Sequence, residues 1–443
     1  MIYVLFVLIG VLLYFSWNVN KKELLSASFL YFLISFLWVG LAISSMKFYG
    51  VYDIHFNTFV IISFSLISFF MGEQFGLRIA LSQKSNKGIE KNKQQNYEYI
   101  DIRPIVTLSI IAICVLNLYL SYNSFLAFLN NNGFGSDFGI AFALARNALT
   151  LGRVEYSKGT ILSQIGLLSS SLTYFLFYAF CRNLVYHKKI DFLKLVPIIP
   201  NVLESVLSTS RNGFIRFFCV LGFILFITYK SYAGWGKRSN RKIFKYAILL
   251  FLLVIVIFRL SGNLTGKTQK IGLQENIYMY FSNSLFAFDS FLNSDYVHSD
   301  FFGKVTLRAL YVLLNRFGTS IPIAEQFFPP YSFGTSGSDN ILTGLCPPIL
   351  DYGYFGTILT RFLLGVLYGR ICQSVKNHTQ SINWIKMVYF GFVMYPLLMM
   401  PIADSLGSLY NLGLLYCLFY MLIINRIFLH EKSIYVFKNT SRG

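Results

Sequence analysis

Residues 25–46 read LSASFLYFLISFLWVGLAISSM, a run without a single charged side chain between Glu23 and Lys47. A helix of about 20 apolar residues crosses the roughly 30 Å hydrocarbon core of a bilayer, so this stretch predicts a membrane-spanning helix. The rest of the chain has the same character. Of its 443 residues 55% are hydrophobic and 13% are charged, and the mean hydropathy is +0.56. Soluble domains carry roughly 25% charged residues, so this composition excludes an ordinary soluble enzyme and a disordered chain.

A scan outward from this stretch predicts eleven spans, at residues 2–17, 25–46, 58–77, 105–123, 160–181, 194–209, 212–229, 246–261, 349–370, 385–402 and 408–428. The first is predicted to remain as a span, because it lacks the basic start and the small-residue cleavage site of a signal peptide. Pro197 and Pro200 predict that the span at 194–209 is kinked or broken. The predicted fold is therefore an all-α polytopic integral membrane protein with about eleven transmembrane helices and two large extracytoplasmic loops.

The net charge of +19 is explained by topology. With the N-terminus outside and the C-terminus inside, about two thirds of the Lys and Arg residues fall on the inner side, as the positive-inside rule requires. The charge therefore marks the cytoplasmic face and does not indicate a nucleic-acid partner. The predicted organisation is 1–123, N-terminal spans with a basic cytoplasmic loop at 78–104; 124–159, a first periplasmic loop; 160–261, central spans; 262–348, a large periplasmic loop; and 349–443, C-terminal spans and a cytoplasmic tail.

Chemistry is expected on the outer face, because loops as long as 124–159 and 262–348 are usually functional when they are not disordered. Arginine at membrane depth normally faces a protein interior or a water-filled cavity, and its planar guanidinium binds phosphate through two N–H groups. A negatively charged ligand in the outer leaflet would explain three arginines at this side of the chain together, namely Arg211, Arg216 and Arg259. The alternative is that they contact lipid headgroups or pair with nearby carboxylates.

Other kinds of site have no sequence signal. The six cysteines are scattered, mostly within apolar runs, and show no metal or disulfide spacing. No phosphate-binding loop, dinucleotide motif or clustered metal ligands occur on the outer side, so neither a cofactor nor a metal is expected. Any outer carboxylate could act as a general base for a hydroxyl nucleophile, and spacing does not select one.

Two stretches resemble one family. STSRNGFIRFFCVLG at 208–222 is similar to the serine-arginine turn that starts a span in Wzy-type O-antigen polymerases, the oligosaccharide repeat-unit polymerases, and Arg211 to Gly222 fits their Arg-x10-Gly pattern. LDYGYFGTILTRFLLGVLYGR at 350–370 resembles their C-terminal span, with Asp351, Gly353, Gly356 and Gly365 in matching places. The order of spans and outer loops extends the resemblance over essentially the whole chain. The first outer loop departs from the pattern, because Arg146 and Arg153 do not begin an Arg-x10-Gly run.

The resemblance implies that the chain joins undecaprenyl-diphosphate-linked oligosaccharide repeat units at the periplasmic face of the inner membrane and releases undecaprenyl diphosphate. It also implies a chain-length regulator protein as a partner. Under this resemblance we expect five arginines to bind the diphosphate or glycan, first Arg211 and Arg216 and then Arg153, Arg146 and Arg259. We expect Glu155, Asp351 or Asp339 to act as the base. Two alternatives stay open. One is an O-antigen ligase, for which His298 is the sole histidine of the long outer loops; the other is a lipid-linked oligosaccharide flippase, which predicts repeated halves and charged residues at the membrane midplane.

Overall fold

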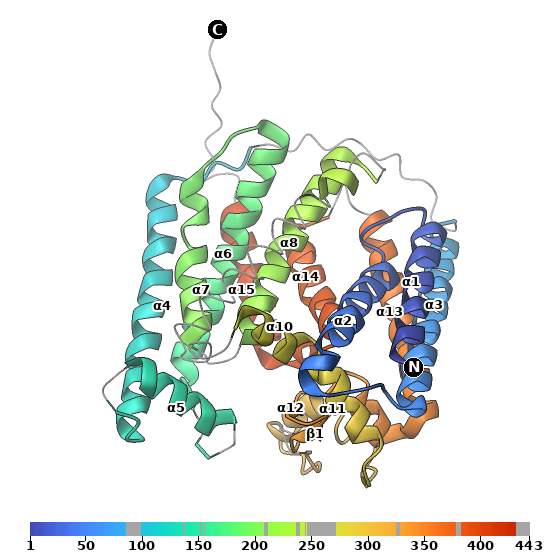
Figure 1. The fold of residues 1–443 in the computed structure, drawn as a ribbon. Helices are drawn as coiled ribbons and strands as arrows, with labels where there is room; N and C mark the ends of the chain where they lie inside the picture. Colours follow the sequence, from blue (N-terminus) through green and yellow to red (C-terminus); the bar gives the residue numbers. More distant parts are fainter. Residues whose placement is uncertain are drawn as a thin grey trace.

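The structure, a computed structural model of the chain, describes all residues except 86–98, 136–137, 151–152, 155, 208–210, 236–239, 244, 246–271, 325–327, 378–381 and 431–443. Helices dominate the described residues, and one antiparallel hairpin of two three-residue strands is found among them (Figure 1). The chain is an all-α polytopic membrane protein, as the composition predicted.

The elements of the N-terminal half are α1 (Ile2–Val19), α2 (Ala27–Tyr49), α3 (Phe56–Ser85), α4 (Pro104–Asn131), α5 (Phe138–Thr150), α6 (Thr160–His187), η1 (Phe192–Leu195), α7 (Ile198–Leu207) and α8 (Arg211–Ala233). Those of the C-terminal half are α10 (Leu273–Phe281), α11 (Asn283–Leu292), α12 (Arg308–Asn315), β1 (Tyr331–Phe333), β2 (Gly337–Asp339), α13 (Cys346–Asn377), α14 (Trp384–Met399), η2 (Leu406–Tyr410), α15 (Leu412–Asn425) and the π-helical turn η3 (Arg426–His430).

Eight helices in the described part of the chain are long and apolar enough to cross a bilayer: α1, α2, α3, α4, α6, α8, α13 and α15 with the turn that follows it. They correspond to eight of the eleven predicted spans. The predicted span at 385–402 forms the shorter apolar helix α14. The span at 194–209 forms the end of the short η1 and the short α7, as its two prolines predicted, and all of 246–261 lies outside the described residues.

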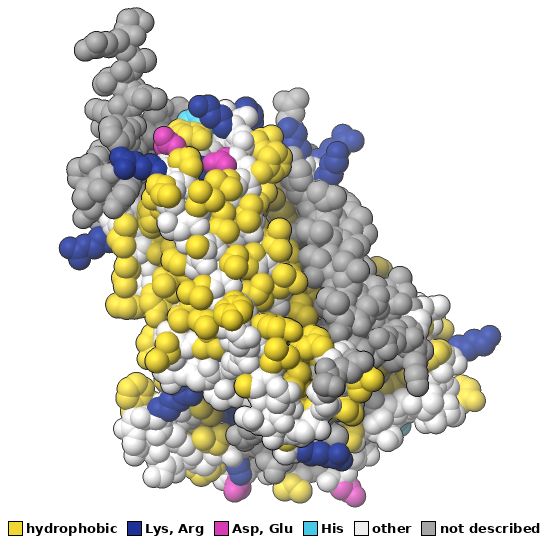
Figure 2. Space-filling model, turned by 90° about the vertical axis from the view of Figure 1, so that its left-hand side faces the viewer, with side chains coloured by type: hydrophobic (Ala, Val, Ile, Leu, Met, Phe, Trp, Pro, Cys, Tyr) yellow, Lys and Arg dark blue, Asp and Glu magenta, His cyan; other side chains and the backbone are white. Residues whose placement is uncertain are grey.

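The lateral surface of the bundle has the polarity of a membrane protein. Figure 2 shows a continuous apolar band around the middle of one face, with Lys, Arg, Asp and Glu side chains gathered above and below it. Large apolar side chains of this kind are exposed along the bundle, for example Val7 on α1 at 64% and Ile105 on α4 at 67%. Water would disfavour such a surface, whereas lipid tails cover it without loss.

The loops divide between the two ends of the bundle as the predicted topology requires. At one end, Arg146 from the first outer loop lies 3.4 Å from the Tyr280 hydroxyl of the second outer loop. At the other end, the Asn183 side chain binds the main chain of Ile100. Lys230 pairs there with Glu23 at 3.0 Å. We refer to these two ends as the outer and the inner end.

The closest helix pair consists of α3 and α13, which run parallel. Gly72 and Gly76 on α3 and Gly365 and Gly369 on α13 have the G-x-x-x-G spacing on both partners. A Cβ atom added to any of the four would meet main-chain atoms of the other helix at 3.1 Å or less. Small residues therefore let the two backbones touch, a common mode of helix association in membranes.

Part of the large outer loop enters the bundle. α10 and α11 follow one another across a bend at Ser282, which is buried, and Ser284 accepts a hydrogen bond of 3.0 Å from the Trp38 indole. Trp38 lies eleven residues, or about 16 Å, along α2 from its outer end at Tyr49. The polar bend between α10 and α11 thus lies at the level of the middle of a span, which is tolerated because protein surrounds it.

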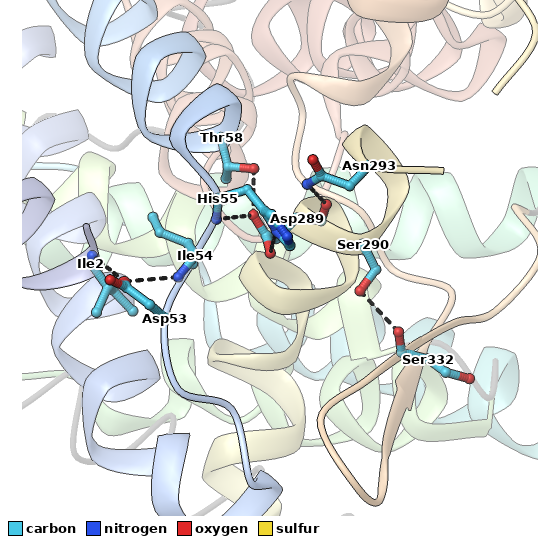
Figure 3. A network of polar contacts seen from close by, with 9 residues as sticks. All are labelled: Ile2, Asp53, Ile54, His55, Thr58, Asp289, Ser290, Asn293 and Ser332. Atoms are coloured by element: carbon cyan, nitrogen blue, oxygen red, sulfur yellow. Dashed lines mark hydrogen bonds and ion pairs between the residues drawn. The ribbon is translucent and has the colours of Figure 1, made fainter. Parts of the chain in front are cut away.

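Asp289 fixes α11 to the start of α3 (Figure 3). Its carboxylate accepts the His55 N–H at 2.9 Å and the Thr58 hydroxyl at 2.6 Å, and it lies 2.9 Å from His55 Nδ1. A carboxylate at a helix N-terminus satisfies N–H groups that have no partner within the helix. Asp289 therefore holds α11 in place beside the spans.

Candidate functional site

α14 ends within the bundle, and this early end creates room for polar groups at the level of the outer half of α13. The two helices run antiparallel, with the Tyr368 hydroxyl of α13 donating to the Val393 carbonyl of α14 at 2.8 Å. Beyond the end of α14, the Met400 carbonyl accepts the Gly344 N–H at 2.9 Å. Two loop segments, one before α13 and one after α14, therefore fill the space above the end of α14.

Arg361 of α13 lies at this level and is fully buried. It is eight residues, or about 12 Å, along the helix from Gly353, whose left-handed backbone (φ 66°) kinks α13. The guanidinium donates to the Gly344 carbonyl and lies against the Met400 sulfur, while Nε has no hydrogen-bond partner. A charged group within a span that lacks a complete set of partners marks a functional site, because burial without compensation is costly.

Asp404 is the carboxylate whose charge interacts with Arg361. It follows α14 by five residues, its side chain is accessible to water, and its Oδ1 accepts the Leu406 N–H at 3.2 Å. Arg361 and Asp404 interact electrostatically but form no direct ion pair. The residue as a whole is exposed, but the protein around the carboxyl group removes water from it, and this desolvation raises the Asp404 pKa above its ordinary value of 3.8, although the Leu406 N–H and Arg361 act in the opposite direction.

A second arginine, Arg216 of α8, lies beside α14. Its guanidinium carbon lies 5.9 Å from the centre of the Phe392 ring. It also interacts electrostatically with Tyr395, which lies beside Ser405. Arg216 thus lies beside α14 at Phe392, and Arg361 lies against Met400, the residue that directly follows this helix. We call the set Arg216, Tyr395, Arg361, Asp404 and Ser405 the arginine site.

The five arginines expected from the sequence to bind the ligand do not form one cluster in the described residues. Arg216 belongs to the arginine site, and Arg146 lies beside Tyr280 at the outer surface. The Arg153 side chain is exposed to water. Arg259 and the side chain of Arg211 lie outside the described residues.

The expected bases are placed in the outer loops. Both carboxylate oxygens of Asp351 accept backbone N–H groups, from Val305 at 3.2 Å and from Thr306 at 2.6 Å. Asp339 accepts the Ile341 N–H at 3.0 Å in the turn that follows β2. Both carboxylates therefore stabilise loop structure. Glu155 lies outside the described residues.

Sequence reasoning missed Arg361 and did not select Asp404 from the other outer carboxylates. The signal for Arg361 is present in the sequence, since it is the single charged residue in 352–369 of an otherwise apolar span. Position within a span should have identified it by the same argument that was applied to Arg216. The sequence around Asp404 gives no such signal, because only the fold brings this carboxylate close to Arg361.

A metal is not implied by the described part of the chain, in which no group of three or more His, Cys, Asp or Glu residues could hold an ion. The six cysteines are free thiols and are buried or half-buried. In comparisons with known proteins, no family model, no curated protein and no solved structure matches this chain. Functional inference therefore depends on the arginine site and on the sequence resemblance.

Proposed function

We propose that the chain is a glycosyltransferase that polymerises lipid-diphosphate-linked oligosaccharide repeat units at the outer face of a bacterial inner membrane. The observation that carries this proposal is Arg361, a fully buried cation in the membrane with no ion-pair partner and an unpaired Nε. Such a group is expected to have a negatively charged ligand, and Arg216 adds a second positive charge beside α14. The resemblance of 208–222 and 350–370 to the polymerases names the ligand as undecaprenyl diphosphate.

Arginine suits the chemistry of this leaving group. The acceptor hydroxyl attacks the anomeric carbon of the donor glycan, and the bond from that carbon to the diphosphate oxygen breaks. The bonding electrons remain on the diphosphate, so negative charge increases there in the transition state. Fixed cations in a site of low dielectric constant stabilise such charge more strongly than water does. Arg361 and Arg216 would provide that stabilisation without requiring a metal or a nucleotide sugar.

Glycan-length profiling in a deletion strain tests the proposal. Cells complemented with Arg361→Met or Arg216→Ala should display single repeat units in place of long polymer, because loss of one electrostatic donor lowers turnover about 10²–10³-fold. Arg361→Lys keeps the charge but loses the planar fork, and an intermediate length is expected. Arg316→Met is the matched control, because Arg316 is exposed at the end of α12.

The outcomes separate the alternatives. A buried charge can often be replaced by an apolar residue without loss of stability. Arg361→Met protein should therefore still reach the membrane, and long polymer made by it would overturn the proposal. Loss of single-repeat units as well as polymer from the cell surface in the deletion strain would instead favour a ligase or a flippase.

A further inference from the structure

The arginine site contains a group that could remove the proton from the acceptor hydroxyl. We propose that Asp404 is the general base of the transfer reaction. This assignment rests on the proposed function and replaces Glu155, Asp351 and Asp339 as the residue expected to do this work.

Asp404 differs in hydrogen bonding from Asp289 and Asp351, and its electrostatic contact with Arg361 distinguishes it from the remaining outer carboxylates. Asp289 receives three hydrogen bonds and Asp351 receives backbone N–H groups on both oxygens, so each is already committed to structure. The Asp404 carboxylate receives the Leu406 N–H on Oδ1, and no donor to Oδ2 is found in the described part of the chain. Oδ2 is therefore free to accept a proton from a substrate.

The location of Asp404 also fits a base. The residue lies in the loop between α14 and η2 and is accessible to water, so an acceptor sugar can approach it from the outer side. It interacts electrostatically with Arg361, which is proposed to bind the leaving diphosphate. The leaving group and the base must both lie near the anomeric carbon. Arg361, which would bind the leaving group, and Asp404, the proposed base, lie at the same end of α14.

The surroundings of Asp404 change the pKa of its carboxyl group in the direction that favours proton transfer. Desolvation raises the pKa of the carboxyl, so the ionised form is a stronger base than an aspartate in free solution. Arg361 keeps that ionised form accessible at neutral pH. Tyr410 lies close enough to Asp404 to sense its charge, and its ring offers an apolar face for a sugar.

The chemical step is a single displacement. Oδ2 of Asp404 takes the hydroxyl proton as the acceptor oxygen forms its bond to the anomeric carbon of the donor. The bond from that carbon to the diphosphate oxygen breaks, and its electron pair leaves on the diphosphate. The proton passes from Asp404 to water after the product leaves, which restores the carboxylate. No oxidant, reductant or metal is needed.

The test uses the full chain purified into lipid nanodiscs. Binding is measured with undecaprenyl diphosphate, and turnover is measured with the lipid-linked repeat units that accumulate in the deletion strain. Asp404→Asn should bind undecaprenyl diphosphate within two-fold of the unchanged protein but turn over about 10²–10⁴-fold more slowly, the range expected for loss of a general base. Asp404→Glu should restore part of the rate. Asp300→Asn is the control, because Asp300 is an exposed loop carboxylate paired with Lys304.

The pH profile supplies a second readout. The unchanged protein should lose activity as the pH falls through the raised pKa of Asp404, and the residual activity of Asp404→Asn should lack that acidic limb. Wild-type turnover by Asp404→Asn would overturn the assignment. Loss of diphosphate binding in Asp404→Asn would also overturn it, because the residue would then position Arg361. If Arg361→Met binds undecaprenyl diphosphate normally, the proposed function itself fails, independently of the base.

Discussion

Gly72→Ala and Gly365→Ala each place a methyl group where α3 and α13 are in backbone contact. The new Cβ of residue 72 would overlap the Phe362 carbonyl oxygen and lie 2.9 Å from its carbon; that of residue 365 would lie 2.9 Å from the Glu73 nitrogen. Carbon atoms pack best at about 3.5–4.0 Å, so the helices must separate by roughly 0.6 Å or more. We expect overpacking of this kind to destabilise the fold by about 1–3 kcal/mol.

Gly166→Ala is the matched control for both substitutions. Gly166 lies inside α6, and its added Cβ would meet the Asn117 side chain at 3.6 Å, an ordinary contact. All three changes gain the same helix propensity, about 1 kcal/mol for alanine over glycine. The difference in unfolding free energy between Gly72→Ala and Gly166→Ala therefore measures the steric clash separately from the helix propensity.

SDS titration of the purified protein in mixed micelles provides the free energies. The double variant Gly72→Ala/Gly365→Ala should lose less than the sum of the single losses, because separation of the helices for one methyl group also makes room for the other. Equal stability of Gly72→Ala and Gly166→Ala would refute the reasoning that α3 and α13 touch through their backbones. Activity should fall together with stability, because Arg361 is the residue directly before Phe362, which Gly72 contacts.

Three further predictions concern the outer end. Asp289→Ala removes three hydrogen bonds at the start of α3 and should destabilise the protein by about 1.5–3 kcal/mol in the same titration, more than His55→Ala, whose side chain is 63% exposed. The raised pKa of Asp404 means that the folded state holds this proton more tightly than the unfolded state, so stability relative to Asp404→Asn should be greatest at acidic pH and decline as the pH rises through that pKa. A membrane-impermeant thiol reagent should label Ser299→Cys but not Ser85→Cys in intact cells, and the reverse pattern would contradict the orientation derived from the positive-inside rule.

The sequence was sufficient for the spans because their signal is local. Twenty apolar residues in a row predict a membrane helix whatever surrounds them, and the prolines at 197 and 200 predicted the broken span for the same reason. The sequence also contained the two G-x-x-x-G spacings on α3 and α13 and the lone arginine in 352–369. The sequence did not show which helices these glycines contact, because many small residues occur in these spans.

The arginine site depended on tertiary structure. Arg216 and Arg361 are 145 positions apart in the sequence, and the fold places one beside Phe392 of α14 and the other against Met400, which follows that helix. The expectation that Asp351 or Asp339 acts as the base followed from their outer location, whereas the folded chain shows that both oxygens of Asp351 accept backbone N–H groups and that Asp404 interacts with Arg361. Hydrophobicity along the chain thus determined which segments enter the membrane, while helix packing and the pairing of buried polar groups decided which charged side chains meet there.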